Sequence, residues 1–176
     1  ECGYIIDMGA NMRYETTVTS LKALLAEGFD AVYVGSGAPK GKELDLPGRW
    51  DAQDQIHLGI DWLANVHFEH LTEIGKRVLI IGVGNTAMDC CRTAKRLGAT
   101  DVKVVARRGR KHFKASPWEL EDAEEEHVQI IENHAPKRFV IEHGKLVGME
   151  FEQLQWSEDA SGKQRSTVLD TVIIPC

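Results

Sequence analysis

The sequence of 176 residues lacks several features that would assign it to a specialised class of protein. It has only four cysteines, and no CxxC pair or zinc-finger spacing occurs among them. No apolar run approaches the ~20 residues that a membrane-spanning helix needs, and no signal peptide opens the chain. Basic residues are in deficit, 21 against 27 acidic ones. These absences argue against a membrane protein, a secreted disulfide scaffold and a nucleic-acid-binding protein, and they favour the cytoplasm.

The composition is that of an ordinary globular protein. Hydrophobic residues make up 43% and charged residues 27% of the chain, and both values are close to globular averages. The length fits one domain, or one domain with pieces of another. Because the first residue is Glu1 and not Met, we expect a piece of a longer protein.

Helices and strands alternate along most of the chain. Apolar runs over residues 77–81, 102–106 and 128–132 predict buried strands, and the intervening segments have helical periodicity. The last 40 residues form three extended runs joined by turns, which is typical of an antiparallel meander. The order predicts an α/β protein with a Rossmann-like, three-layer dinucleotide-binding fold, built from a parallel sheet and this meander.

The segments before residue 77 have weaker patterns. They predict a helix ending at Gly9, a helix between Ser20 and Gly28, a buried strand over residues 29–34, a linker over residues 40–52 and a long helix over residues 53–71.

A glycine-rich turn follows the strand over residues 77–81 and leads directly into a helix. It has the pattern GxGxxA, in which the first glycine allows a tight turn, the second lets the backbone approach a pyrophosphate, and the alanine keeps the helix close to the sheet. Free N–H groups at the helix start favour phosphate. The alternative is a purely structural turn. The candidate cofactor-binding residues here are Gly82, Val83, Gly84, Asn85, Thr86 and Ala87.

The end of the next strand indicates which dinucleotide binds. An NAD-binding protein usually has an acidic residue there for the ribose 2′-hydroxyl, as does an S-adenosylmethionine site. Here the strand ends in Arg107 and Arg108, while the nearest acid, Asp101, lies at its beginning. Two guanidinium groups suit a 2′-phosphate, and Lys114 adds charge. We therefore predict NADPH, with a solvated basic loop as the alternative.

The combined motifs resemble a known family. Residues 29–40, the turn of residues 82–90 and the Arg107–Arg108 pair are similar to the pyridine-nucleotide-binding part of the glutamate synthase small subunit. The NADPH-oxidising half of dihydropyrimidine dehydrogenase is similar too. In this family the NADPH fold is inserted into an FAD fold. The resemblance therefore implies an FAD-domain fragment with linker at residues 1–50, an NADPH-binding domain at 51–170, and the start of the return to the FAD domain at 171–176.

The resemblance also implies a function. In the full-length protein, hydride passes from NADPH to FAD and then to iron–sulfur centres, through an iron–sulfur domain or a large partner subunit. The FAD fingerprint expected before Glu1 is missing, so we expect FAD only in the full-length protein and no turnover by this chain alone. The apolar surface left without its FAD domain favours a homodimer. The alternative function is a nucleotide-sensing or subunit-docking domain without electron transfer.

Few other residues carry a chemical prediction. No residue is predicted to be catalytic, because the nicotinamide and the flavin carry the reaction. Asn85 and Thr86 are expected to make polar contacts to the pyrophosphate or the ribose. Ser116 and Glu119 form a predicted capping box, and the acidic run over residues 119–126 is expected to be a solvated helix face. No metal site is predicted, since the spaced histidines lack a further ligand.

Overall fold

A computed structural model describes residues 2–37, 40–159 and 161–176 of the chain. The chain divides into two compact units, Glu1–Ala38 and Pro39–Cys176. Among the described residues, no helix is both long enough and apolar enough to cross a membrane.

The first unit contains two short helices and no strand among its described residues. Helix α1 spans Cys2–Asp7 and helix α2 spans Leu21–Leu25. Both lie where the sequence predicts helices: Gly9, with φ +99°, follows α1, and the Ser20 hydroxyl accepts a hydrogen bond from an N–H in the first turn of α2. The predicted strand over residues 29–34 is wrong, because an extended segment becomes a strand only by pairing with a neighbour.

The second unit is built on a parallel sheet of three strands. Strand β1 (Arg77–Ile81) pairs with β2 (Asp101–Val105), which pairs with β3 (Gln129–Ile131). Helix α4 (Asn85–Arg96) connects β1 to β2, and helix α5 (Pro117–Glu125) lies between β2 and β3 in the chain. The carboxyl ends of all three strands therefore meet at one edge, which is where ligands bind in open α/β sheets.

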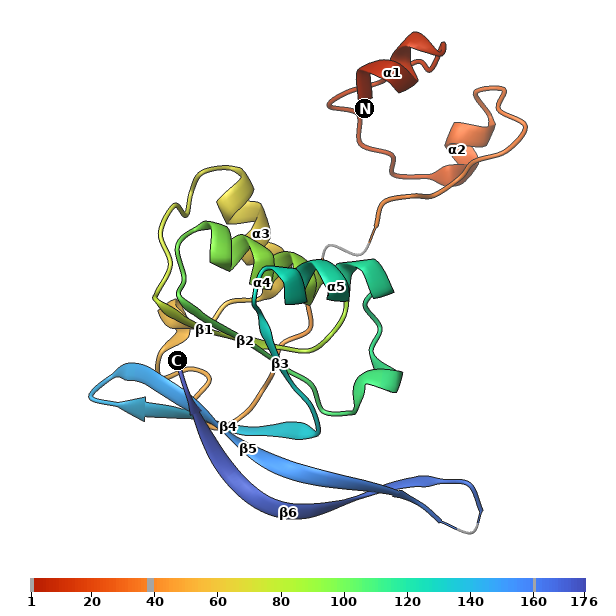
Figure 1. The fold of residues 1–176 in the computed structure, drawn as a ribbon. Coiled ribbons are helices and arrows are strands. Elements are labelled where there is room, and N and C mark those ends of the chain that lie inside the picture. Colours follow the sequence, from red (N-terminus) through yellow and green to blue (C-terminus); the bar gives the residue numbers. More distant parts are fainter. Residues whose placement is uncertain (1, 38–39, 160) are drawn as a thin grey trace. The chain divides into compact units, whose positions relative to one another are not determined.

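An antiparallel sheet covers the face of the parallel sheet that lies opposite the helices (Figure 1). It consists of β4 (His134–Glu142), β5 (Lys145–Glu158) and β6 (Gln164–Pro175), in the order β4-β5-β6. Figure 1 shows the resulting layers of the second unit: helices, parallel sheet and antiparallel sheet. The predicted α/β fold with a parallel sheet and a meander is confirmed.

Alternation along the parallel strands creates two cores. On β1, Val78 and Ile80 pack into the core beneath the helices, whereas Leu79 packs into the core between the two sheets. On β3, Ile130 and Ile131 divide in the same way. Successive side chains of a strand point to opposite faces, so both faces of the parallel sheet are buried.

Residues 53–71, before β1, form two short helical segments and not the single helix that the sequence predicts. In place of one helix over residues 53–71, the chain forms a 3-10 turn at Gln53–Gln55 and helix α3 at Gly59–His67. Gly59 lies at the contact of α3 with α4, since a Cβ atom there would be 3.0 Å from the Cys90 Sγ. A glycine at this position lets the two helices approach closely.

The predicted linker over residues 40–52 belongs to the packed body of the second unit. Leu44 and Leu46 pack into the core between the two sheets. Gly48 has φ +85°, and a Cβ atom there would lie 2.7 Å from the carbonyl oxygen of Phe139. The compact unit begins at Pro39, and the assignment of the flanking segments to an FAD fold remains a prediction.

Candidate functional site

The glycine turn joins β1 to α4 at the carboxyl edge of the parallel sheet. Gly82 has φ +112°, which favours glycine, and its N–H donates to the carbonyl of Val105 (3.0 Å). Gly84 is the N-cap of α4, and its carbonyl accepts the N–H of Ala87 (2.9 Å). The turn is therefore tied to β2 on one side and to the first turn of α4 on the other.

Open space lies beside both glycines of the turn. A Cβ atom built at Gly82 or at Gly84 would meet no other atom within 4 Å. Gly84 has φ −103° and ψ 174°, a conformation that any residue adopts, so neither backbone strain nor a protein contact explains a glycine there. A ligand approaching the backbone at this point would explain it.

The start of α4 offers free hydrogen-bond donors toward this space. In the described part of the chain, the backbone N–H groups of Asn85 and Thr86 have no acceptor. Both residues begin helix α4, which is 12 residues long, and the helix dipole favours negative charge at this end. The residues present thus fit a pyrophosphate: a backbone without obstructing Cβ atoms and with donors at a helix start.

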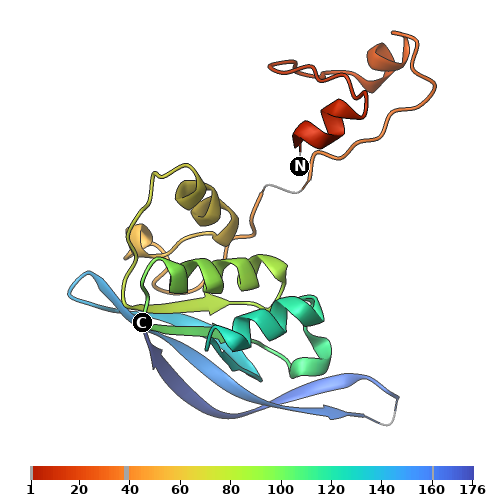
Figure 2. The same cartoon turned by 45° about the horizontal axis from the view of Figure 1, so that its top comes forward.

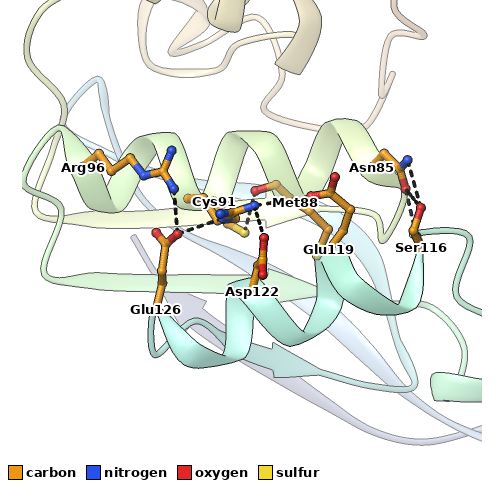
Figure 3. A network of polar contacts seen from close by, with 9 residues as sticks. Asn85, Met88, Cys91, Arg96, Ser116, Glu119, Asp122 and Glu126 are labelled. Carbon is orange, nitrogen blue, oxygen red and sulfur yellow. Dashed lines mark hydrogen bonds and ion pairs between the residues drawn. The ribbon is translucent and has the colours of Figure 1, made fainter.

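The side chain of Asn85 faces α5 and not the open space. Its Oδ1 atom accepts the N–H of Ser116 (2.9 Å), and its Nδ2 group donates to the Ser116 hydroxyl (3.3 Å). Figure 3 shows the two side chains pointing toward each other at one end of α4. In this structure the side chain of Asn85 is therefore occupied by Ser116, whereas its backbone N–H has no acceptor among the described residues.

The predicted capping box at α5 is wrong because Ser116 is hydrogen-bonded to Asn85. Ser116 is the N-cap residue but makes no side-chain cap hydrogen bond, because Asn85 engages both its N–H and its hydroxyl. Glu119 instead faces Arg92 of α4, with 3.5 Å between Oε2 and Nη1. The start of α5 is therefore fixed to the glycine turn through Asn85, a link that local sequence signals do not reveal.

The loop after β2 is also fixed to the glycine turn. The carbonyl of Val83 accepts the backbone N–H groups of Lys114 and Ala115, both at 3.0 Å. Arg107, Arg108 and Lys114 are exposed. The structure therefore places the predicted basic residues on a loop whose far end is bonded to the turn.

The three arginines of this loop differ in their charge partners: Arg110 has a carboxylate partner, whereas Arg107 and Arg108 do not among the described residues. Arg110 binds Glu124 of α5 through both terminal nitrogens, one at 3.0 Å, which raises the pKa of Arg110. Across residues 2–37, 40–159 and 161–176, Arg107 and Arg108 have no carboxylate within ion-pair distance. Asp101 lies at the other end of β2, where it pairs with Lys103. The two arginines remain available to an anion.

Trp156 is a site residue that the sequence reasoning missed. Its indole N–H donates to the carbonyl of Arg107 (3.1 Å), and the Arg108 guanidinium carbon lies 4.5 Å from its ring centroid. The contact joins residues 49 positions apart, so no local pattern could have indicated it.

A charged network holds α4 against α5 on the side away from the turn. Arg92, whose side chain is 22% exposed, contacts Asp122 (2.8 Å) and Glu126 (2.8 Å), and Arg96 also contacts Glu126 (2.8 Å). Figure 2 shows the two helices side by side, and Figure 3 shows Glu119, Asp122 and Glu126 on the side of α5 that faces α4. The hydrogen bond from Arg92 lowers the pKa of Glu126. The prediction of a solvated acidic face is thus wrong for this edge of α5.

Comparison with known proteins gives the family. Residues 6–172 match the family described as pyridine nucleotide-disulphide oxidoreductase. The chain belongs to this family. The NADPH-Fe(3+) oxidoreductase subunit beta of Geobacter sulfurreducens is 34% identical over 166 residues, covering 92% of this chain and 25% of the relative. The glutamate synthase (NADPH) small chain of Azospirillum brasilense is 34% identical over 153 residues, covering 80% of this chain and 31% of the relative.

A solved structure supports the fold. Mycobacterium tuberculosis FprA in complex with NADPH matches with a TM-score of 0.61 and 16% identity, over 87% of this chain and 49% of that one. The chain spans about a quarter to a third of the length of the two relatives and about half of FprA. The predicted resemblance to a glutamate synthase small subunit is confirmed.

The three cysteines whose side chains the structure describes are not in disulfide bonds. The sequence has no CxxC, and Cys90, Cys91 and Cys176 are free. Burial raises the pKa of Cys90 to about 12 and that of Cys91 to about 11. Both thiols belong to the core beneath the helices. They stay protonated at neutral pH, which makes them poor nucleophiles.

Proposed function

We propose that residues 51–170 are the NADPH-binding domain of an FAD-dependent oxidoreductase. The observation that carries this proposal is the open space beside Gly82 and Gly84, at a helix start with free N–H groups. Two arginines that have no carboxylate partner among the described residues follow the neighbouring strand. This combination suits a dinucleotide with a pyrophosphate and a 2′-phosphate.

Each part of the site has a binding role in this proposal. The turn from Gly82 to Ala87 holds the pyrophosphate, with Val83 fixing the basic loop and with N–H groups donated by Asn85 and Thr86. Arg107 and Arg108 bind the 2′-phosphate as planar forks, and Lys114 adds positive charge. The bound nicotinamide supplies the hydride, so the residues of this chain bind and orient the cofactor and none is assigned as catalytic.

In the whole protein, we propose that hydride passes from NADPH to FAD, and electrons then reach iron–sulfur centres or a partner subunit. Residues 1–50 would comprise a fragment of the flanking FAD fold and a linker, of which Leu44 and Leu46 pack onto the NADPH-binding domain, and residues 171–176 would begin the return to the FAD fold. The names of two relatives, an NADPH-Fe(3+) oxidoreductase subunit beta and a glutamate synthase (NADPH) small chain, support NADPH as the electron donor. The isolated chain is expected to bind NADPH without flavin and without turnover, and a yellow preparation with stoichiometric flavin would contradict that boundary.

The substitution Gly84→Ala tests the site directly. A methyl group there would meet no protein atom, yet it would enter the space assigned to the pyrophosphate. We expect the affinity for NADPH and for NADH to fall by about tenfold each, a loss of ~1.4 kcal/mol. The free energy of unfolding should change by less than ~1 kcal/mol.

The matched control is Gly75→Ala, two residues before the start of β1. A Cβ atom at Gly75 makes only an ordinary contact, 3.7 Å from the carbonyl oxygen of Arg77. This variant should bind both cofactors like the wild type. Unchanged binding by Gly84→Ala in calorimetric titration would show that the open space is not the pyrophosphate site. If the wild-type chain bound NADPH but NADPH did not reduce the flavin of a reconstituted full-length protein, the result would favour the nucleotide-sensing alternative.

A further inference from the structure

Trp156 contacts both arginines that follow β2. Its indole N–H fixes the backbone of Arg107 through a hydrogen bond of 3.1 Å. Its ring face lies against the guanidinium of Arg108, with 4.5 Å between the guanidinium carbon and the ring centroid. One side chain of the antiparallel sheet therefore touches two successive residues at the end of a parallel strand.

The topology explains how Trp156 reaches this position. Pairing of β4 with β5 ends at His134 and Gln153, whereas β5 and β6 continue to pair through Trp156 and Ser166. The end of β5 and the start of β6 thus form a two-stranded extension beyond β4 (Figure 1). Trp156 lies on this extension and brings it to the end of β2.

Stacking leaves the hydrogen-bonding edge of Arg108 free. A guanidinium over an aromatic face is attracted by the ring quadrupole, while its N–H groups lie in its own plane and remain available to an anion. A carboxylate partner would occupy those groups, as Glu124 does for Arg110. The contact with Trp156 therefore orients the charge without neutralising it.

We propose that Trp156 is a positioning residue for recognition of a 2′-phosphate. It fixes the backbone at Arg107 and orients the guanidinium of Arg108, so it sets the preference for a 2′-phosphorylated nucleotide over its unphosphorylated counterpart. This inference rests on the proposed function and adds to it a specificity role on the antiparallel sheet.

The chain offers a matched control tryptophan. Arg49 lies over the ring of Trp50, 4.8 Å from its centroid, but its guanidinium binds Glu43 (2.6 Å). The substitutions Trp156→Leu and Trp50→Leu each remove one arginine–aromatic contact. Only the first removes a contact to an arginine without a carboxylate partner.

The experiment measures the binding of adenosine 2′,5′-bisphosphate and of adenosine 5′-monophosphate by calorimetry. These ligands differ by the 2′-phosphate and lack the nicotinamide, so they report on this end of the site alone. For Trp156→Leu we expect the ratio of the two affinities to fall about three- to tenfold, with the monophosphate affinity changed by less than about twofold. Trp156→Phe keeps an aromatic face but no N–H donor, so we expect a loss of about twofold to threefold in the ratio.

The outcomes separate this inference from the proposed function. Equal binding of both ligands by the wild type would overturn the cofactor assignment, and the role of Trp156 with it. A wild-type preference that both Trp156 variants retain would overturn the role of Trp156 alone. An equal fall in the affinities for both ligands would also overturn the role of Trp156, because the loss of a merely structural residue would have that effect. Trp50→Leu should keep the wild-type ratio, and a matching loss in this control would count against a specific role of Trp156.

Discussion

The arginines of α4 and of the loop before α5 fall into two groups with different partners. Arg92, Arg96 and Arg110 bind carboxylates of the segment from Glu119 to Glu126. Arg107 and Arg108, on the loop between β2 and α5, contact a tryptophan and no carboxylate in the part of the chain that the structure describes. The difference separates charge that joins helices from charge that is available to a ligand.

The comparison has a physical basis. A carboxylate partner neutralises a guanidinium and occupies its donors, so a paired arginine contributes to the fold. An unpaired arginine contributes little to the fold and keeps its full charge for an incoming anion. Substitutions in the two groups should therefore change different measured quantities.

The largest expected effect is on cofactor preference. Arg107→Ala combined with Arg108→Ala should lower the ratio of NADPH to NADH affinity by about ten- to a hundredfold, because each charge-assisted hydrogen bond contributes roughly 1.5–3 kcal/mol. NADH affinity and the free energy of unfolding should change little, since neither side chain has a carboxylate partner. Calorimetric titration and urea unfolding measure the two quantities. The control Lys111→Ala removes an exposed charge of the same loop and should leave the ratio near its wild-type value.

The next effect should be on stability and not on binding. Arg92→Met removes the centre of the α4–α5 network and leaves three carboxylates near one another. We expect the free energy of unfolding to fall by about 1–2 kcal/mol, more than for an exposed pair because Arg92 is partly buried. Arg96→Met should cost less than ~0.5 kcal/mol, because Arg96 is 64% exposed. A changed preference for NADPH over NADH in Arg92→Met would contradict the claim that the paired arginines contribute to the fold and not to cofactor binding.

Acid should weaken the same network. The pKa of Glu126 is lowered in the folded chain, chiefly by its hydrogen bond to Arg92, so its stabilising contribution is present above the unfolded pKa of about 4.3. That contribution is lost as the pH falls through the folded value. Arg92→Met should therefore lose less stability than the wild type between about pH 6 and pH 3. Parallel pH profiles of the two proteins in urea unfolding would contradict this assignment.

The smallest expected effect comes from removing the carboxylate partner of Arg110, so that it resembles Arg107 and Arg108. Glu124→Gln removes the carboxylate partner of Arg110 and leaves an unpaired cation near the proposed 2′-phosphate site. We expect NADPH affinity to rise by about twofold at low salt and by less at high salt, because exposed charges interact weakly through water. A fall in NADPH affinity would mean that the ion pair with Glu124 itself shapes the site.

The parts of this molecule that sequence predicts are those fixed by short-range patterns. The turn from Gly82 to Ala87 follows from glycine spacing, and the positions of β1, β2 and β3 follow from short apolar runs. The arginine pair follows from its place at a strand end. Each of these signals lies within a few residues along the chain, and the structure places all of them at one edge of the sheet.

The missed features all depend on residues far apart in the chain. Asn85 bonds to Ser116 and Trp156 to Arg107, at separations of 31 and 49 positions. Gly48 faces the backbone of Phe139, which turns a predicted linker into part of the packed body. The predicted strand over residues 29–34 has no pairing partner in the described chain, and a sequence pattern does not state whether a partner strand is present.

The most direct test of the cofactor assignment is calorimetric titration of the wild-type chain with NADPH and with NADH at low and at high salt. The unpaired arginines predict that NADPH binds about ten- to a hundredfold more tightly at low salt, with a smaller ratio at high salt because the 2′-phosphate contacts are screened. Equal affinities for NADPH and NADH at low salt would contradict the account, and would show that Arg107 and Arg108 belong to a solvated loop.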